Sequence, residues 1–209
     1  MKKIFFLIIL IVSLIDPAII EGQTKYLKHP PAKLGYGLKG GINIAWQNSP
    51  DNNSAVLVKE ILGVNAGGYI NYFYTRKFAL QGELVVSGKG LNWKDSFDQH
   101  MKDVATYVDI NALAKYQVHK YLNIHAGPVL SYRLNATRKD LKENVVSEIK
   151  DLYESLEVSA AAGVELNLPI KINVTLRYLR GITPAIKDEI GPWYNNLVQF
   201  SVGYRFAGR

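Results

Sequence analysis

Two carboxylates and an imidazole are the side chains of this sequence with the clearest potential for chemistry. Glu83, Asp109 and His125 lie in stretches where polar and apolar residues alternate, and a carboxylate beside an imidazole can transfer protons. Ser131 shares an alternation face with His125, which adds a hydroxyl to the set. The sequence offers no identifiable third partner, and paired charges also gather for structural reasons. We therefore expect a structural role for these residues and no catalytic site.

Metal and cofactor sites are also not indicated. The chain has no cysteine and four histidines, of which His29 and His119 lie in connecting segments. Disulfides and thiolate metal sites are thereby excluded, and no histidine or carboxylate pair has the spacing of metal ligands. The GLKGG segment at 37–41 lacks the strand-to-helix context of a phosphate-binding loop. We expect no cofactor and interpret these glycines as permitting strand curvature or close packing.

The elements that must position these side chains are strands. Between Val108 and Tyr132, two runs of about ten residues alternate between apolar and polar side chains, with a short connection at 117–120. Alternation with a period of two is the strand pattern, and about ten residues is the length of a tilted strand that crosses a bilayer. These two runs predict one hairpin of a membrane barrel.

The same alternation recurs along the whole chain. It predicts eight strands, at residues 35–46, 63–74, 78–88, 108–116, 122–132, 156–166, 171–179 and 197–206. Three short turns alternate with four long connections, one of them spanning 89–106. A further connection, 135–155, has apolar residues at a helical spacing, and we interpret it as a loop that contains a short surface helix. The expected fold is all-β, an eight-stranded antiparallel up-and-down transmembrane β-barrel with a polar lumen plugged by side chains.

The main alternative architecture is a soluble eight-stranded calyx of the lipocalin type, in which the apolar face would line the cavity. The apolar face of this chain also carries aromatic residues near the strand ends, and two aromatic rings around an aliphatic band are typical of a membrane interface. We therefore place that face against lipid. The predicted interface aromatics are Tyr36, Trp46, Tyr72, Tyr74, Phe78, Tyr116, Tyr132, Tyr178, Tyr204 and Phe206.

The polar face then fills the lumen, where a carboxylate without a partner would cost several kcal/mol. We predict a structural lumen cluster of Glu83, Asp109, Lys115, His125, Glu165 and Arg177. Within it, Arg177 is long enough to reach Glu83 or Asp109 across the barrel, which predicts a Glu83–Asp109–Arg177 group near the middle.

The N-terminus predicts export. Lys2 and Lys3 precede an apolar run from Ile4 to Ile15, which is too short for a spanning helix and suits a secretory signal peptide. We assign residues 1–23 to the signal peptide, 24–34 to a short extended leader, 35–206 to the outer-membrane barrel domain and 207–209 to a short C-terminal tail. The strand parity predicts that both termini are periplasmic.

The formal net charge of +7 comes from basic residues that are spread along the chain. The absence of a basic patch argues against nucleic acid. We expect contact with outer-membrane lipids, including lipopolysaccharide, and with the barrel assembly machinery through the C-terminal strand.

Six segments carry a resemblance to a known family: GLKGGINIA, LQGELVVSGKG, VDINALAKY, YLNIHAGPVLSY, RYLRGIT and VQFSVGYRF. In these the chain resembles the Bacteroidota outer-membrane β-barrel proteins that include PorT, a component associated with gliding motility and type IX secretion. It departs from that family at Asp109 and Asn111, where the family often has glutamate and proline, and in the residues that follow Phe206. The resemblance implies envelope or secretion proteins as partners.

Four functions follow from this sequence. The first is a non-enzymatic outer-membrane protein with a structural or accessory role at the cell envelope, in protein secretion or surface assembly. The second is a surface receptor or adhesin that binds a partner through its long extracellular loops. A lipid-modifying barrel enzyme and a small pore are the remaining alternatives, and the plugged lumen argues against the pore.

Overall fold

The computed structural model describes residues 34–48, 57–94, 100–140, 145–188 and 191–208. The chain divides into two compact units, Met1–Pro31 and Ala32–Arg209, and all described residues belong to the second. The predicted signal peptide, and the predicted leader up to residue 33, lie outside the described residues.

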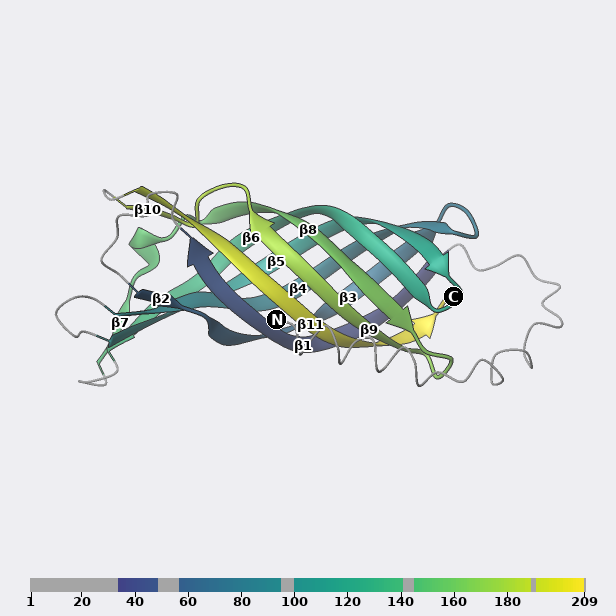
Figure 1. Ribbon diagram of the computed structural model, residues 1–209, viewed down its shortest axis with the longest axis horizontal. Helices are drawn as coiled ribbons and strands as arrows, with labels where there is room; N and C mark the ends of the chain where they lie inside the picture. Colours follow the sequence, from purple (N-terminus) through teal and green to yellow (C-terminus); the bar gives the residue numbers. More distant parts are fainter. Residues whose placement is uncertain (1–33, 49–56, 95–99, 141–144, 189–190, 209) are drawn as a thin grey trace. The chain divides into compact units, whose positions relative to one another are not determined.

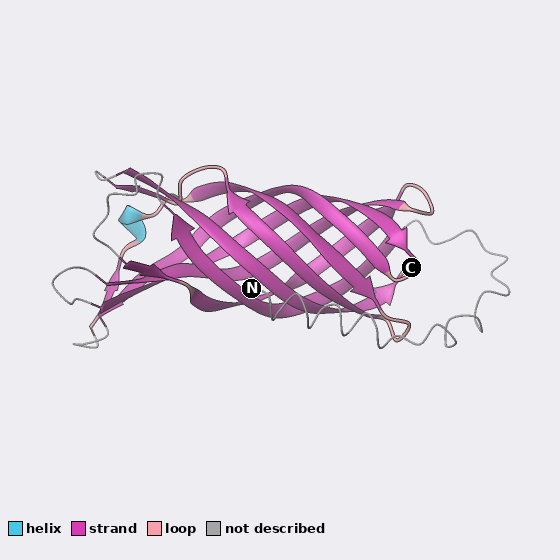
Figure 2. Cartoon of the chain, in the orientation of Figure 1, coloured by secondary structure: helices cyan, strands magenta, loops and turns pink. Residues whose placement is uncertain are grey.

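Eight long antiparallel strands form the second unit (Figures 1 and 2). They are β1 (Leu34–Asn48), β3 (Ile61–Phe73), β4 (Phe78–Lys94), β5 (His100–His119), β6 (Leu122–Asp140), β8 (Leu156–Asn167), β9 (Ile172–Gly181) and β11 (Gly191–Ala207). Each strand pairs with the next long strand along the chain, and β11 pairs with β1 to close the ring. The predicted eight-stranded up-and-down barrel is confirmed.

The two ends of the barrel differ. At one, which we name the turn end, short turns at 74–77, 120–121 and 168–171 join the strands, and β1 begins and β11 ends there. At the other, the loop end, the shorter strands β2 (Leu57–Lys59), β7 (Val146–Glu148) and β10 (Ile186–Asp188) extend the sheet beside the 3-10 turn η3 (Lys150–Leu152) (Figure 1). In the part of the chain that the structure describes, no helix has the length and hydropathy to cross a membrane.

Two sequence predictions for the loop end are wrong. The connection predicted at 89–106 consists largely of strand, because the ladder between β4 and β5 continues out to the pair of Lys94 with His100. The helix predicted within 135–155 is also largely absent: β6 runs on to Asp140, and the described remainder holds the short strand β7 and the single 3-10 turn η3. Leu141, the first residue at helical spacing, lies outside the described residues; of the others Ile149 is buried while Val145 and Leu152 are exposed, so these three form no continuous apolar helix face.

Apolar side chains face outward on every long strand. Leu62 and Val64 are 72% and 71% exposed, and Leu84 and Ile110, near mid-strand, are 58% and 54% exposed. An apolar band around a closed barrel is what a bilayer requires and what a soluble calyx lacks. The predicted interface aromatics all lie outside the lumen, and two pairs are in ring contact: Tyr36 with Phe206 at 6.0 Å and Trp46 with Tyr178 at 6.1 Å.

Inward side chains fill the barrel. Beside the polar residues lies a ring of buried apolar residues: Ala45, Ile61, Leu113, Val129, Ala161, Leu179 and Leu197. A second apolar cluster lies at the loop end, on β5, β6 and either side of η3: Ala105, Tyr107, Ala136, Ile149 and Tyr153. Close approach of strands also explains one glycine of the GLKGG segment, because a Cβ on Gly41 would lie 1.9 Å from the Phe200 carbonyl oxygen. An interior of this width is occupied by its own side chains.

Candidate functional site

A network of charged side chains crosses the lumen and is the candidate site. At its centre, Arg177 of β9 meets Glu83 of β4 through two parallel hydrogen bonds, Nη1 to Oε2 at 2.7 Å and Nη2 to Oε1 at 2.8 Å. Lys39 of β1 donates to the same carboxylate at 3.0 Å. The Arg177 and Glu83 side chains are fully shielded from solvent. This geometry is the strongest form of a protein ion pair, since both donors of the guanidinium fork are used.

Neutral side chains complete this central group. Asn111 and Gln81 donate to Glu83, and the Nε of Arg177 donates to His125 Nε2 at 3.0 Å. A histidine nitrogen that accepts a hydrogen bond carries no proton, so the imidazole lies here as the neutral form with its proton on Nδ1. His125 is therefore an acceptor within the network, and its position satisfies the third donor group of Arg177.

A second ion pair lies toward the turn end. Lys115 Nζ donates to both oxygens of Glu165, at 2.8 and 2.9 Å, and Asn123 donates to Oε1 at 3.2 Å. All three side chains are buried. Buried charges of this kind are retained only with partners and hydrogen bonds, and both conditions are met.

Asp109 belongs to a third group, so the prediction that it joins Glu83 and Arg177 is wrong. It lies 3.2 Å from the ammonium of Lys89, which is 3.9 Å from Glu157, donates to Ser131 at 2.8 Å and sits 4.5 Å from the Tyr107 ring. Asp109 thus pairs with Lys89, and Arg177 pairs with Glu83. Lys89 was missed because the sequence prediction ended its strand at residue 88. The sequence nevertheless indicated an inward position for Lys89, because it follows Glu83 and Ser87 at the two-residue spacing of one strand face.

The buried charges of these three groups balance. Four cations, Lys39, Lys89, Lys115 and Arg177, face four carboxylates, Glu83, Asp109, Glu157 and Glu165. The six predicted cluster residues are thus all inside the lumen, distributed over three groups. Balance without excess charge is the arrangement expected of a structural plug, because it leaves no buried ion uncompensated.

This geometry does not resemble a catalytic site. Ser131 is fully buried and receives a hydrogen bond from an ammonium held between two carboxylates, so Lys89 acts as a donor and has no lone pair for the hydroxyl proton. His125 faces Arg177, and both are closed off from solvent. Among the described residues, no three histidine, aspartate or glutamate side chains gather as metal ligands would.

Residues 22–187 match the family described as outer membrane protein beta-barrel domain. The chain belongs to this family. The match ends before β11, the strand that closes the barrel, and the family places the protein in the outer membrane. No curated protein matches the chain.

Solved structures of outer-membrane barrels share the fold. Ail, the attachment invasion locus protein of Yersinia pestis, was solved in complex with the heparin analogue sucrose octasulfate. It is 11% identical, with 83% of this chain and 99% of Ail covered and a TM-score of 0.51. Neisserial surface protein A is also 11% identical, with 82% of this chain and 97% of that one covered and a TM-score of 0.52. At this low identity, the similarity to the two structures shows a shared fold and nothing beyond it.

The loop end of this barrel has its own charged contact. Arg138 of β6 forms two 2.7 Å hydrogen bonds to Asp103 of β5 and lies 5.1 Å from the Trp93 ring of β4. Tyr153, just after η3, is buried in the adjacent apolar cluster. Burial, and next the negative charge of Asp103, raise the pKa of the Tyr153 phenol well above its ordinary value. The extended strands β4, β5 and β6 are thus tied together outside the apolar band.

Proposed function

We propose that this protein is a non-enzymatic outer-membrane barrel with a closed lumen, which acts through its two ends in a structural or accessory role at the cell envelope. The observation that carries the proposal is the Arg177–Glu83 salt bridge across the lumen, shielded from solvent and flanked by the Lys89 and Lys115 ion pairs. The apolar ring that includes Leu113 and Leu179 adds a dry barrier. A solute pathway would have to break both.

The orientation we infer places the turn end in the periplasm and the loop end outside. Bacterial outer-membrane barrels have short periplasmic turns and longer outer loops, and both strand termini of this barrel lie at the turn end. The outward apolar band would contact lipid, including lipopolysaccharide on the outer side. The resemblance to the PorT-containing group supports a role in protein secretion or surface assembly, with envelope proteins as partners.

Conductance and phenotype together test this proposal. In planar bilayers the purified mature chain should show no stable channel, and a strain lacking the gene should show altered surface or secreted proteins with an unchanged lipid A profile. Large stable currents would replace the accessory role with that of a pore. A changed lipid A mass spectrum that is restored by the wild-type gene would replace it with that of a lipid-modifying enzyme.

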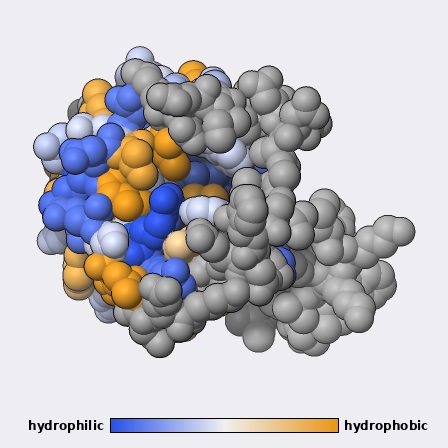
Figure 3. All heavy atoms as spheres, turned by 90° about the vertical axis from the view of Figure 1, so that its left-hand side faces the viewer, coloured by the Kyte–Doolittle hydropathy of each residue, from blue (hydrophilic) through white to orange (hydrophobic). Residues whose placement is uncertain are grey.

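A surface receptor or adhesin is the second candidate, and the described strands at the loop end favour it. The Asp103–Arg138 contact and the buried Tyr153 hold β4, β5 and β6 in fixed positions beyond the apolar band. Viewed from that end, the described surface is largely hydrophilic with small apolar groups between (Figure 3). Side chains held on paired strands can bind a partner with little loss of backbone entropy.

Shortening one hairpin separates the two candidates. Replacing residues 92–102 by Asn-Gly would join Leu91 to Asp103, which are paired in the β4–β5 ladder, through a two-residue turn. If the barrel folds and binding of cells to their target surface is lost, the receptor is favoured. If the secreted-protein phenotype is complemented as by wild type, the accessory role does not need this hairpin.

A further inference from the structure

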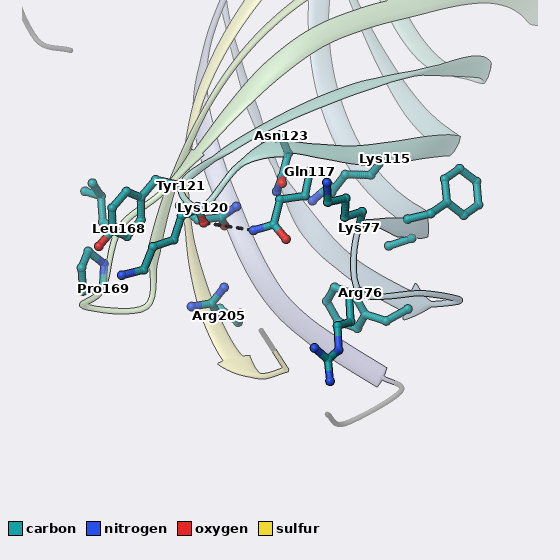
Figure 4. Close-up of a pocket in the computed structure, with 14 residues that line it drawn as sticks. Arg76, Lys77, Lys115, Gln117, Lys120, Tyr121, Asn123, Leu168, Pro169 and Arg205 are labelled. Carbon is teal, nitrogen blue, oxygen red and sulfur yellow. Dashed lines mark hydrogen bonds between the residues drawn. The ribbon is translucent and has the colours of Figure 1, made fainter. Parts of the chain in front are cut away.

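A pocket of about 190 Å³ opens at the turn end of the barrel (Figure 4). Its walls come from all three short turns and from the last strand, and it is separate from the charged groups deeper in the lumen except that Lys115 and Asn123 reach both. Side chains from the turns at 74–77, 120–121 and 168–171 meet Arg205 of β11 around it. The pocket thus exists only in the closed barrel, where these segments come together.

The lining is strongly basic. Five of the fourteen lining residues are cations, Arg76, Lys77, Lys115, Lys120 and Arg205, and none is acidic. Glu165 neutralises Lys115, as described above. Among the described residues, neither Lys77 nor Arg205 forms a salt bridge with a carboxylate. This contrasts with the deeper lumen, where each cation has an acidic partner.

Neutral groups give the pocket further recognition elements. In Figure 4 the side chains of Arg205 and Gln117 both point into the space between the turns. The Gln117 Nε2 donates to the Lys120 carbonyl at 3.0 Å, which fixes that amide across the opening, and Lys120 Nζ lies 5.1 Å from the Tyr121 ring. The site therefore combines cations from separate segments with an oriented amide and an aromatic wall.

We propose that this turn-end pocket binds a compact anionic ligand through a phosphate group. A phosphate monoester carries a charge of about −1.5 to −2 and several acceptor oxygens, which suits cations that approach from different sides, and arginine is favoured for such planar recognition. The volume corresponds to roughly six water molecules at about 30 Å³ each, enough for a phosphate and a few attached atoms. It is too small to enclose a folded peptide segment.

This proposal is independent of the proposed function, because it concerns the opposite end of the barrel from the receptor surface and requires no solute pathway. Two sources supply the same chemistry: the phosphate of a lipid headgroup and a soluble phosphorylated small molecule. An acidic peptide of a periplasmic partner is the competing ligand class, which the experiment below separates.

Calorimetric titration of the mature chain in phosphatidylcholine nanodiscs tests the pocket. The probes are glycerol 3-phosphate, inorganic phosphate, succinate and a short Asp-Glu peptide, each at constant ionic strength in chloride. We expect glycerol 3-phosphate to bind and the variants Arg205→Gln and Lys77→Gln each to weaken its binding about five- to ten-fold. Arg205 is half-buried and Lys77 is exposed, so both variants should fold, which their thermal melts would verify.

The matched control is Lys171→Asn. Lys171 ends the 168–171 turn with a φ of 65°, a conformation that asparagine tolerates, and it does not itself line the pocket. It removes the same charge from the same end, so glycerol 3-phosphate affinity should stay within two-fold of wild type. An equal loss of affinity in Lys171→Asn would show that general surface charge causes the effect, and this would overturn the proposed site.

The remaining outcomes also decide. No binding of either phosphate probe, or binding of the acidic peptide ten-fold tighter than of glycerol 3-phosphate, would overturn a phosphate site. Nanodiscs with added phosphatidylglycerol distinguish the two sources of phosphate. If the apparent affinity for glycerol 3-phosphate then falls in wild type but not in Arg205→Gln, the pocket is supported and lipid is the source. Unchanged affinity supports it with a soluble ligand.

Discussion

Arg177 and Glu83 are 94 residues apart in the chain and bridge β9 to β4 through two parallel hydrogen bonds of 2.7 and 2.8 Å. The two strands are not neighbours in the sheet, so this contact ties opposite parts of the barrel wall together. Lys39 of β1 and Asn111 of β5 also donate to Glu83, so this carboxylate accepts hydrogen bonds from three other strands. The centre of the lumen is therefore organised around one carboxylate.

Removing Glu83 alone should be more harmful than removing the whole pair. Glu83→Gln leaves both Arg177 and Lys39 without their carboxylate and should lower the free energy of unfolding by about 3–5 kcal/mol, the cost of breaking a buried pair. Glu83→Gln combined with Arg177→Met should recover part of that loss, because it removes one of the two uncompensated cations. Urea unfolding in lipid vesicles measures both, with exposed Lys139→Gln as the neutral control. A double variant less stable than the single one would contradict the assigned pairing.

Double-mutant cycles should separate the third group from the first. Lys89 and Asp109 are in direct contact, so the variants Lys89→Met and Asp109→Asn should show a coupling energy of about 1–3 kcal/mol. Asp109 and Arg177 belong to different groups, and their coupling should stay within about 0.5 kcal/mol. Coupling of Asp109 to Arg177 as strong as that to Lys89 would restore the single central cluster that the structure replaces.

Alternation in the sequence predicted the eight strands and the inward polar side chains because a two-residue period is fixed by strand geometry alone. Glu83, His125 and Arg177 all lie inside the lumen on the face that their parity indicates. The choice of partners could not be predicted in this way. Contact across a lumen depends on strand tilt and side-chain reach, and these set Asp109 beside Lys89 at 3.2 Å.

The loop end was harder to predict for a different reason. Outside the bilayer an outward side chain gains nothing from being apolar, so strands such as the end of β6 lose their alternation while keeping their backbone pairing. The spacing of Val145, Ile149 and Leu152 then indicated a helix that does not form, since only Ile149 is buried. The turn-end pocket likewise leaves no local signal, because its cations come from segments far apart in the chain.

Alkaline pH should release the segment around Tyr153. The pKa of the buried phenol is raised above its ordinary value near 10, chiefly by burial and then by Asp103. In the released segment the phenol ionises near pH 10, so docking is fully favoured below that pH and loses stability as the pH rises above it. Because the chain has no cysteine, a nitroxide on Asp151→Cys can report the mobility of η3 by electron paramagnetic resonance.

The control for this titration is Tyr153→Phe, which keeps the ring and removes the ionisable group. Between pH 8 and 11.5 the mobile fraction of the nitroxide should rise in the parent and stay nearly flat in the phenylalanine variant. The same rise in both proteins would show that another group drives the release.

A charge on the outward face should reveal the lipid contact directly. Leu84 is 58% exposed near the middle of β4, so Leu84→Arg should lower the free energy of unfolding in vesicles by about 2–4 kcal/mol, as found for arginine at a bilayer midplane. Tyr74 is 75% exposed at the turn end, and Tyr74→Arg should cost about 0–1 kcal/mol because the side chain reaches the interface. The ratio of the two losses in free energy of unfolding therefore reports the depth of each side chain in the bilayer, and not merely the loss of an apolar contact. Equal costs at the two positions would contradict a bilayer-spanning band, since a water-exposed surface treats both sites alike.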